Sequence, residues 1–106
     1  MKAIIIVTTT LESQKEAEHL AKRLVDDRLV ACAQVSGPIT SFYRWQGEVE
    51  SATEFTLSMK TTRQGYPALE KRLIELHPYD LPEIISNAPN GVNDDYLDWV
   101  YGEVRR

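Results

Sequence analysis

The first thirty residues change from an unbroken apolar run to a helical pattern. Residues 2–9 contain the apolar stretch Ile4–Val7, which is typical of a strand buried on both faces of a sheet. Ser13 and Glu16 then have the spacing of a capping box, a motif that begins helices. Behind them, apolar residues recur at helical intervals with charged residues between, so we expect an amphipathic helix. Its apolar positions are Ala17, Leu20, Ala21 and Leu24.

The middle of the chain predicts a long hairpin. Residues 30–44 are strand-like, but the segment 36–38 (Ser-Gly-Pro) interrupts them, and a bend or bulge is expected there because proline cannot donate to a ladder. The segment 45–48 contains a glycine that is free to take a positive φ, which favours a turn. Residues 49–61 alternate apolar and polar side chains, so we expect them to return as the second strand.

The remaining residues predict a second helix, a short strand and a final helix. Tyr66, Leu69, Leu73 and Leu76 lie at helical spacing, with Pro67 in the first turn and Pro78 as a stop. Residues 83–88 are expected to form the short strand, and Asn93 can cap the last helix. This order, β-α-β-β-α-β plus a C-terminal helix, is the ferredoxin-like α+β arrangement, with both main helices on one face of an antiparallel sheet.

The predicted hairpin is too long for its own domain. Strands of about 13 to 15 residues, at roughly 3.3 Å per residue, extend about 45 Å, whereas a compact domain of this length is about 35 Å across. The tip carries Phe42, Tyr43 and Trp45, which a monomer would leave exposed to water. We therefore expect these three side chains to form an interface between subunits. The alternative is that the bend at residues 37–38 folds the hairpin back onto its own core.

Composition narrows the class of protein. A chain of 106 residues is of single-domain size, so residues 1–106 are expected to form one domain. The net charge of −4 argues against a nucleic-acid partner. The early apolar run is far shorter than the roughly 20 residues that span a bilayer, so no membrane association is expected. One cysteine cannot form an internal disulfide, and we expect a cytoplasmic protein.

The segment 77–83 (His-Pro-Tyr-Asp-Leu-Pro-Glu) concentrates candidate chemistry between the second helix and the short strand. Its two prolines hold the preceding residues extended, so polar groups are presented from a stiff connection. His77, Asp80 and Glu83 offer the nitrogen and oxygen ligands that suit copper or zinc. The alternative is structural, because a histidine is favoured at a helix C-terminus without any metal and Glu83 can pair with a basic side chain.

A second set of residues offers candidates for a ligand cleft: Cys32, Lys60, Tyr79, Tyr96 and Trp99. Cys32 is either a small buried hydrophobe or a soft thiolate ligand. Lys60 is either solvated or placed to meet a small anionic ligand. The aromatic side chains either line a pocket or pack. The chain has no phosphate-binding glycine loop, no Cys-x-x-Cys and no His-Glu-x-x-His motif, so neither an enzyme nor an obligatory cofactor is expected.

Four blocks of the sequence, in this order and spacing, resemble the CutA family of divalent-cation tolerance proteins. They are residues 30–34 (Val-Ala-Cys-Ala-Gln), 41–48 (Ser-Phe-Tyr-Arg-Trp-Gln-Gly-Glu), 77–83 and 96–99 (Tyr-Leu-Asp-Trp). The resemblance covers essentially the whole chain. It implies a closed homotrimer with PII-like architecture, in which hairpins reach neighbouring subunits and ligands bind in clefts between them.

The resemblance also implies a role in the response to divalent metals such as copper. The family's proposed copper ligands fall, by position, on Thr8, Leu76 and Glu83, of which only the glutamate is retained. We therefore expect weak copper binding that does not involve Cys32. Two functions remain open: a trimeric binding or signalling protein, and a structural or adaptor trimer whose only partner is another protein. A third, an enzyme, has no motif in the sequence to support it.

Overall fold

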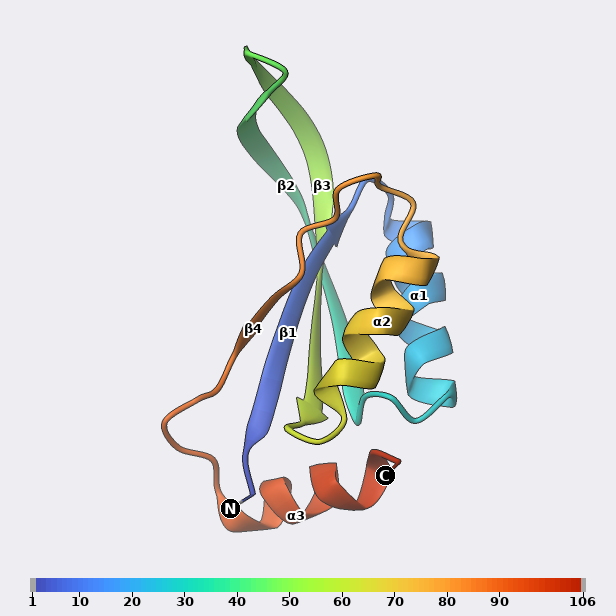
Figure 1. Ribbon diagram of the computed structural model, residues 1–106, viewed down its shortest axis with the longest axis vertical. Helices are drawn as coiled ribbons and strands as arrows, with labels where there is room; N and C mark the ends of the chain where they lie inside the picture. Colours follow the sequence, from blue (N-terminus) through green and yellow to red (C-terminus); the bar gives the residue numbers. More distant parts are fainter. Residues whose placement is uncertain (1, 106) are drawn as a thin grey trace.

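A four-stranded antiparallel sheet with the order β2-β3-β1-β4 forms the centre of the structure, a computed structural model that describes residues 2–105 (Figure 1). The elements are β1 (Ile4–Leu11), α1 (Gln14–Asp26), β2 (Cys32–Trp45), β3 (Glu48–Thr62), α2 (Tyr66–Leu76), β4 (Ile85–Asn87) and α3 (Asp94–Glu103). The predicted order of elements and the ferredoxin-like α+β class are confirmed. β4 is shorter than predicted, since only three of its residues pair with β1.

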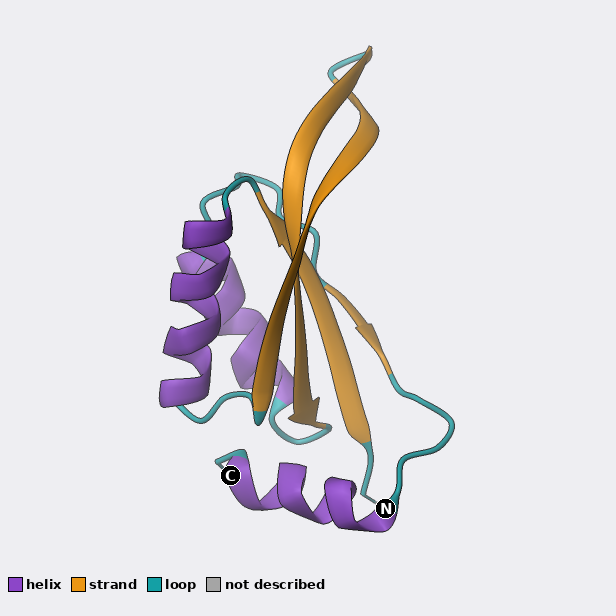
Figure 2. Ribbon diagram, turned by 180° about the vertical axis from the view of Figure 1, so that it is seen from behind, coloured by secondary structure: helices purple, strands orange, loops and turns teal. Residues whose placement is uncertain are grey.

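Helices α1 and α2 lie side by side on one face of the sheet (Figures 1 and 2). The predicted cap of α1 is present, because the Ser13 hydroxyl accepts a hydrogen bond from the Glu16 backbone N–H at 3.0 Å. The main core forms between these helices and the sheet. Its fully buried members include Val7, Leu11, Leu24, Leu57, Met59, Leu69 and Leu73. Within residues 2–105, no helix has both the length and the apolarity needed to cross a bilayer.

Helix α3 packs against the opposite face of the sheet, near the start of β1 (Figure 2). Strand residues alternate between faces, so Ile4 joins Val100 and Val104 in a second, smaller apolar cluster on this side. Arg28, which has a φ of 60°, donates hydrogen bonds to the carbonyl oxygens of Gly102 and Glu103. These two bonds tie the C-terminal end of α3 to the connection between α1 and β2.

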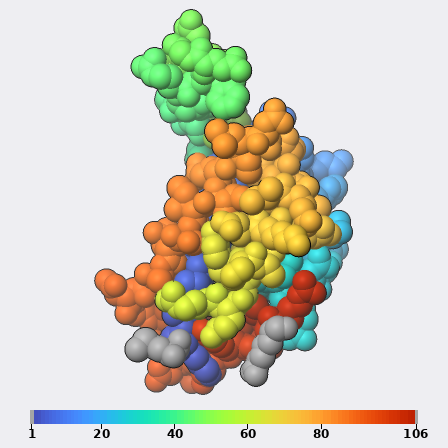
Figure 3. Space-filling model, in the orientation of Figure 1, coloured from blue at the N-terminus to red at the C-terminus, as the bar shows by residue number. Residues whose placement is uncertain are grey.

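Strands β2 and β3 form the predicted long hairpin, whose tip stands clear of the body (Figures 1 and 3). The molecule measures 45 × 27 × 22 Å along its principal axes. The pairing shifts register between Ser36 and Ile39, which confirms the predicted interruption. Gly37 is required there, since its φ is 136° and a Cβ would lie 2.9 Å from the Phe55 ring. Phe42 is 74% exposed and Val49 is 64% exposed, so the tip is not folded back onto its own core.

The close packing before α2 gives a stability test at Gly65. A Cβ at this position would lie 2.8 Å from Thr61 Oγ1 and 3.0 Å from Val104 Cγ1. Gly65→Ala should therefore lower the free energy of unfolding by roughly 1–3 kcal/mol through overpacking. Gly102→Ala is the matched control, because a Cβ there has open space and alanine favours the α3 helix by about 1 kcal/mol. Urea unfolding at a fixed protein concentration measures both, and equal effects would contradict the packing argument.

Candidate functional site

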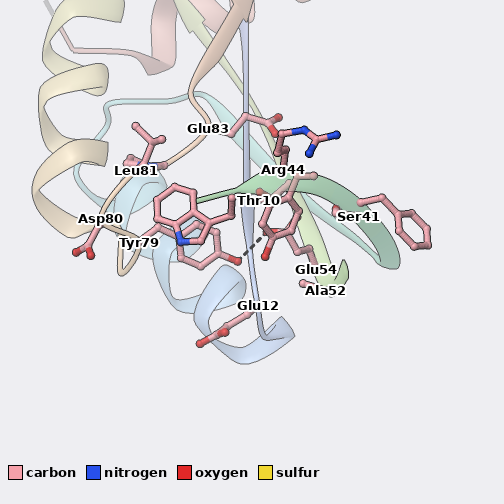
Figure 4. Close-up of a pocket in the computed structure, with 14 residues that line it drawn as sticks. Thr10, Glu12, Ser41, Arg44, Ala52, Glu54, Tyr79, Asp80, Leu81 and Glu83 are labelled. Atoms are coloured by element: carbon pink, nitrogen blue, oxygen red, sulfur yellow. Dashed lines mark hydrogen bonds between the residues drawn. The ribbon is translucent and has the colours of Figure 1, made fainter. Parts of the chain in front are cut away.

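A groove of about 780 Å³ lies between the outer half of the hairpin and the connection from α2 to β4 (Figure 4). The hairpin supplies one wall through residues 41–45, and residues 79–83 supply the other. The floor includes Thr10 at the end of β1 and Glu54 of β3. The groove is lined by most of two of the sequence blocks named above, residues 41–48 and 77–83.

Glu54 is a buried carboxylate at the floor of this groove, with 9% of its surface exposed. The Tyr79 hydroxyl donates a hydrogen bond of 2.8 Å to its Oε2 atom (Figure 4). Burial by itself would raise the pKa of Glu54, but hydrogen bonds from Ser41, Tyr79 and Thr10 outweigh it, so the pKa is lowered. Glu54 is therefore ionised at neutral pH, and the partners that stabilise its charge are hydroxyl groups.

His77 is buried beside this network, with 8% of its surface exposed. Its Nε2 atom lies 2.9 Å from the Thr10 carbonyl oxygen and 3.0 Å from Thr9 Oγ1. Its Nδ1 atom accepts a hydrogen bond of 3.1 Å from the Tyr79 backbone N–H. Burial lowers the pKa of His77 despite the opposing contribution of the Thr10 carbonyl. The ring is therefore neutral at pH 7, and both of its nitrogens are occupied by protein groups.

Tyr79 connects the histidine to the carboxylate. Its ring packs edge-on against the His77 ring, with centroids 4.7 Å apart and an interplanar angle of 63°. Burial and the hydrogen bond to Glu54 raise the pKa of Tyr79, so its hydroxyl keeps its proton and acts as the donor. The chain of contacts therefore runs from β1 through His77 and Tyr79 to Glu54 on β3.

The lining of the groove combines negative charge with aromatic surface. It contains four carboxylates, Glu12, Glu54, Asp80 and Glu83, and one guanidinium, that of Arg44. Four aromatic rings share the lining: Phe42, Tyr43, Trp45 and Tyr79. A site with this balance attracts positively charged ligands and disfavours anions.

The structure does not bring His77, Asp80 and Glu83 together as a metal site. Among the residues described, no three His, Cys, Asp or Glu side chains are grouped closely enough to hold a metal ion. His77 points to β1 and has no free nitrogen, whereas Asp80 and Glu83 are exposed. The predicted convergence of these three side chains is therefore corrected. The structural alternative for His77 describes its position, because the ring anchors the connection after α2.

The five predicted cleft residues are divided between two places. Tyr79 lies in the groove, whereas the other four lie near α3 and the start of the hairpin. Cys32 pairs with Lys60 in the ladder, and its sulfur lies 3.6 Å from the Tyr96 hydroxyl. This contact with Cys32, together with burial, raises the pKa of Tyr96 to about 12.

The two remaining members of this set have partners of their own. The Tyr96 and Trp99 rings lie 5.5 Å apart, and Lys60 Nζ donates a hydrogen bond of 2.6 Å to Gln34 Oε1. Within one protomer, Tyr79 therefore lies in the groove and the other four residues lie in a separate cluster near α3. The cleft between subunits stays a prediction. Within this cluster, Lys60 makes its hydrogen bond to a neutral amide on the neighbouring strand.

Three residues of the groove were not predicted from the sequence: Glu54, Thr10 and Ser41. Glu54 sits in a strand with an ordinary alternating pattern, where a glutamate is expected to face water. The one available signal was its position opposite the interruption of β2, since Glu54 pairs with Ile39 immediately after the register shift. A change of register is where a strand residue can be turned toward another segment.

Together, the fold and the groove define a class: a small ferredoxin-like α+β protein with an extended hairpin and a groove at the base of its outer half. Residues 5–103 match the family described as CutA1 divalent ion tolerance protein. The chain is 43% identical over 95 residues to the divalent-cation tolerance protein CutA of Thermus thermophilus. The match covers 90% of this chain and 92% of that protein. The chain belongs to the CutA family, and the resemblance of the four sequence blocks is confirmed.

Solved structures agree with this assignment. CutA from Synechococcus elongatus matches with a TM-score of 0.93 at 36% identity, covering 97% of this chain and 91% of that chain. CutA1 from Pyrococcus horikoshii matches with a TM-score of 0.91 at 38% identity, covering 96% of this chain and 99% of that one. These matches extend over both the body and the hairpin.

Removing the Tyr79 hydroxyl tests the network at the floor of the groove. Tyr79→Phe leaves the buried, charged Glu54 without one of its donors, so the free energy of unfolding should fall by about 1.5–3 kcal/mol. The pKa of Glu54 should rise, which NMR titration can follow. Tyr66→Phe is the control, because the Tyr66 hydroxyl donates to Glu70 on the exposed surface. A loss of stability no larger than that of the control would show that the contact with Glu54 contributes little.

Proposed function

We propose that this protein contributes to the tolerance of divalent metal ions, copper among them, by binding a ligand in the groove and not by catalysis. The family assignment supports the link to divalent cations. The observation that carries the binding role is the ionised Glu54 at the floor of a groove in which carboxylates outnumber basic groups. This balance favours a positively charged ligand in the groove, and Lys60, the predicted partner of a small anionic ligand, does not line it.

We further propose that the working unit is a homotrimer. The support is the exposed apolar surface of the hairpin, which a lone protomer leaves in water. Phe42 and Val49 are mostly exposed, and Tyr43 and Trp45 are 44% and 43% exposed. Exposed apolar patches of this kind mark interaction surfaces, and the space-filling view shows the hairpin projecting beyond the body (Figure 3).

The single free cysteine suits a reducing compartment, which favours a cytoplasmic location.

An adaptor trimer that binds only another protein is the competing function. It requires the same hairpin interface but no occupant of the groove. Equilibrium binding with a panel of divalent ions separates the two functions, and adenine nucleotides serve as an anionic control that the groove should not bind. Saturable binding that is lost in Glu54→Gln supports the ligand-binding role. Absence of any binding, with the trimer intact, supports the adaptor.

Sedimentation equilibrium tests the oligomeric state. We expect the mass of a trimer at micromolar concentration. Trp45→Ala should weaken the assembly by about 2–4 kcal/mol if the ring fills a pocket on a neighbour. Ile74→Ala, which shortens an exposed side chain on α2, should leave the assembly unchanged. A monomer mass for the parent protein, or an unchanged dissociation profile for Trp45→Ala, would contradict the proposed interface.

Copper binding should be weak, because no group of three ligands exists among the described residues. Isothermal titration of the parent, Cys32→Ser and His77→Gln with Cu²⁺ is expected to give similar, weak isotherms. Cys32 is half-buried against Tyr96, and both nitrogens of His77 are already hydrogen-bonded. A tight isotherm that disappears in Cys32→Ser would show that the thiolate holds the ion.

A further inference from the structure

The wall of the groove formed by residues 79–83 depends on one imidazole ring. His77 is the C-cap residue of α2, and its backbone N–H donates to the Leu73 carbonyl oxygen at 2.8 Å. Its side chain reaches β1 through Nε2 and holds the Tyr79 backbone through Nδ1. Because Tyr79 in turn donates to Glu54, the ring links the connection after α2 to two strands of the sheet.

The partners of the ring fix its protonation. The Thr10 carbonyl oxygen can only accept a hydrogen bond, so the proton of the neutral ring lies on Nε2. The Tyr79 backbone N–H can only donate, so Nδ1 must carry a lone pair. A second proton on Nδ1 would place two N–H groups against each other across 3.1 Å. The imidazolium form of His77 is therefore incompatible with the observed position of Tyr79.

We propose that His77 is a proton-operated latch: the neutral ring holds residues 79–83 closed against the hairpin, and protonation of the ring releases Tyr79 from Glu54 and opens that wall of the groove. The inference rests on the contacts of the ring and does not require the proposed metal-related function. It concerns the shape of the groove, whatever ligand the groove binds. Release of this wall would remove the side chains of Tyr79, Asp80, Leu81, Pro82 and Glu83 from the lining.

The charged groups around the His77 ring affect its pKa, and therefore the pH range in which the latch opens. Glu16 of α1 and Glu54 of β3 favour the protonated ring, as does the C-terminal end of α2. β1 contributes only the Thr9 hydroxyl and the Thr10 carbonyl. In the adjoining connection, the neutral Tyr79 contacts the ring, and the carboxylates Asp80 and Glu83 are exposed. Burial is the largest effect and outweighs these contributions, so the pKa of His77 lies below its ordinary value of 6.5.

The lowered pKa of His77 determines how the stability of the closed wall changes with pH. A released ring has an ordinary pKa near 6.5, and the latched ring has a lower one. The closed wall is therefore fully stabilised above about pH 6.5 and loses stability as the pH falls through the histidine range. Glu54 does not interfere in this window, because its pKa lies below 4.5. Between pH 6.5 and 4.5, His77 is thus the member of the network that changes charge.

Amide hydrogen exchange tests the latch directly. After correction for the intrinsic exchange rate, the protection of the Tyr79 amide should fall as the pH is lowered from 7 to 5. The fall should reach up to about ten-fold per pH unit between the pKa values of the released and latched rings, since one proton is linked to opening. The Val7 amide in the core is the internal reference and should keep its protection. Loss of protection at both amides together would indicate global unfolding and overturn the proposal.

Two variants separate the ring from other titrating groups. His77→Gln can accept from Tyr79 and donate to Thr10 but cannot gain a proton, so its Tyr79 protection should not depend on pH between 7 and 5. His19→Gln replaces the chain's other histidine, which is exposed on α1, and should respond like the parent. A pH response that persists in His77→Gln, or disappears in His19→Gln, would overturn the proposal.

A measurement on the parent protein tests the proposal without requiring that a variant fold. NMR titration of the two histidine rings gives the pKa of each. The midpoint of the opening reported by Tyr79 exchange should follow the titration of His77 and not that of His19. In a Trp99→Phe background, the fluorescence of Trp45, which lines the opposite wall, should change over the same range. Protection and fluorescence that stay constant while His77 titrates would show that the ring does not hold the wall.

Discussion

The antiparallel ladder between β2 and β3 is the constraint on which the rest of the structure depends. It runs from the pair Cys32 and Lys60 to the pair Trp45 and Glu48, whereas β1 pairs with β3 only as far as Leu11 and Phe55. Beyond that point the sheet continues as a two-stranded ribbon, and an isolated ribbon is only marginally stable in water. The outer half of the hairpin therefore needs contacts from outside the ladder, and the connection after α2 provides them along one side.

Glu54 occupies the boundary between the sheet and the ribbon. It is the first residue of β3 beyond the last pair with β1, and hydroxyl groups from β1, β2 and the connection after α2 stabilise its charge. A buried carboxylate is costly unless its hydrogen bonds are satisfied, so the position of each donor is strongly constrained. The same network that joins the ribbon to the body also forms the floor of the groove, which means that groove shape and hairpin position are coupled.

Membership of the CutA family gives this arrangement its functional context. The relatives are named for divalent-cation tolerance, yet the described residues contain no compact set of metal ligands. The carboxylates of the groove are spread around its lining and accompanied by aromatic rings, which suits a ligand larger than a bare ion. The proposed binding role therefore depends on the charge and shape of the groove.

The sequence by itself determined the order of the elements, the cap at Ser13, the interruption near Gly37 and the family. These features depend on local periodicity and on residue types with strong backbone preferences, which act over a few positions. The tertiary structure alone decided the site, because the contact between His77 and Thr9 joins residues 68 positions apart and that between Tyr79 and Glu54 joins residues 25 apart. The sequence left two roles open for His77, a metal ligand together with Asp80 and Glu83, and a structural residue at the end of a helix. Packing against β1 buries the ring, and both of its nitrogens form hydrogen bonds with protein groups. The local sequence pattern does not predict these contacts.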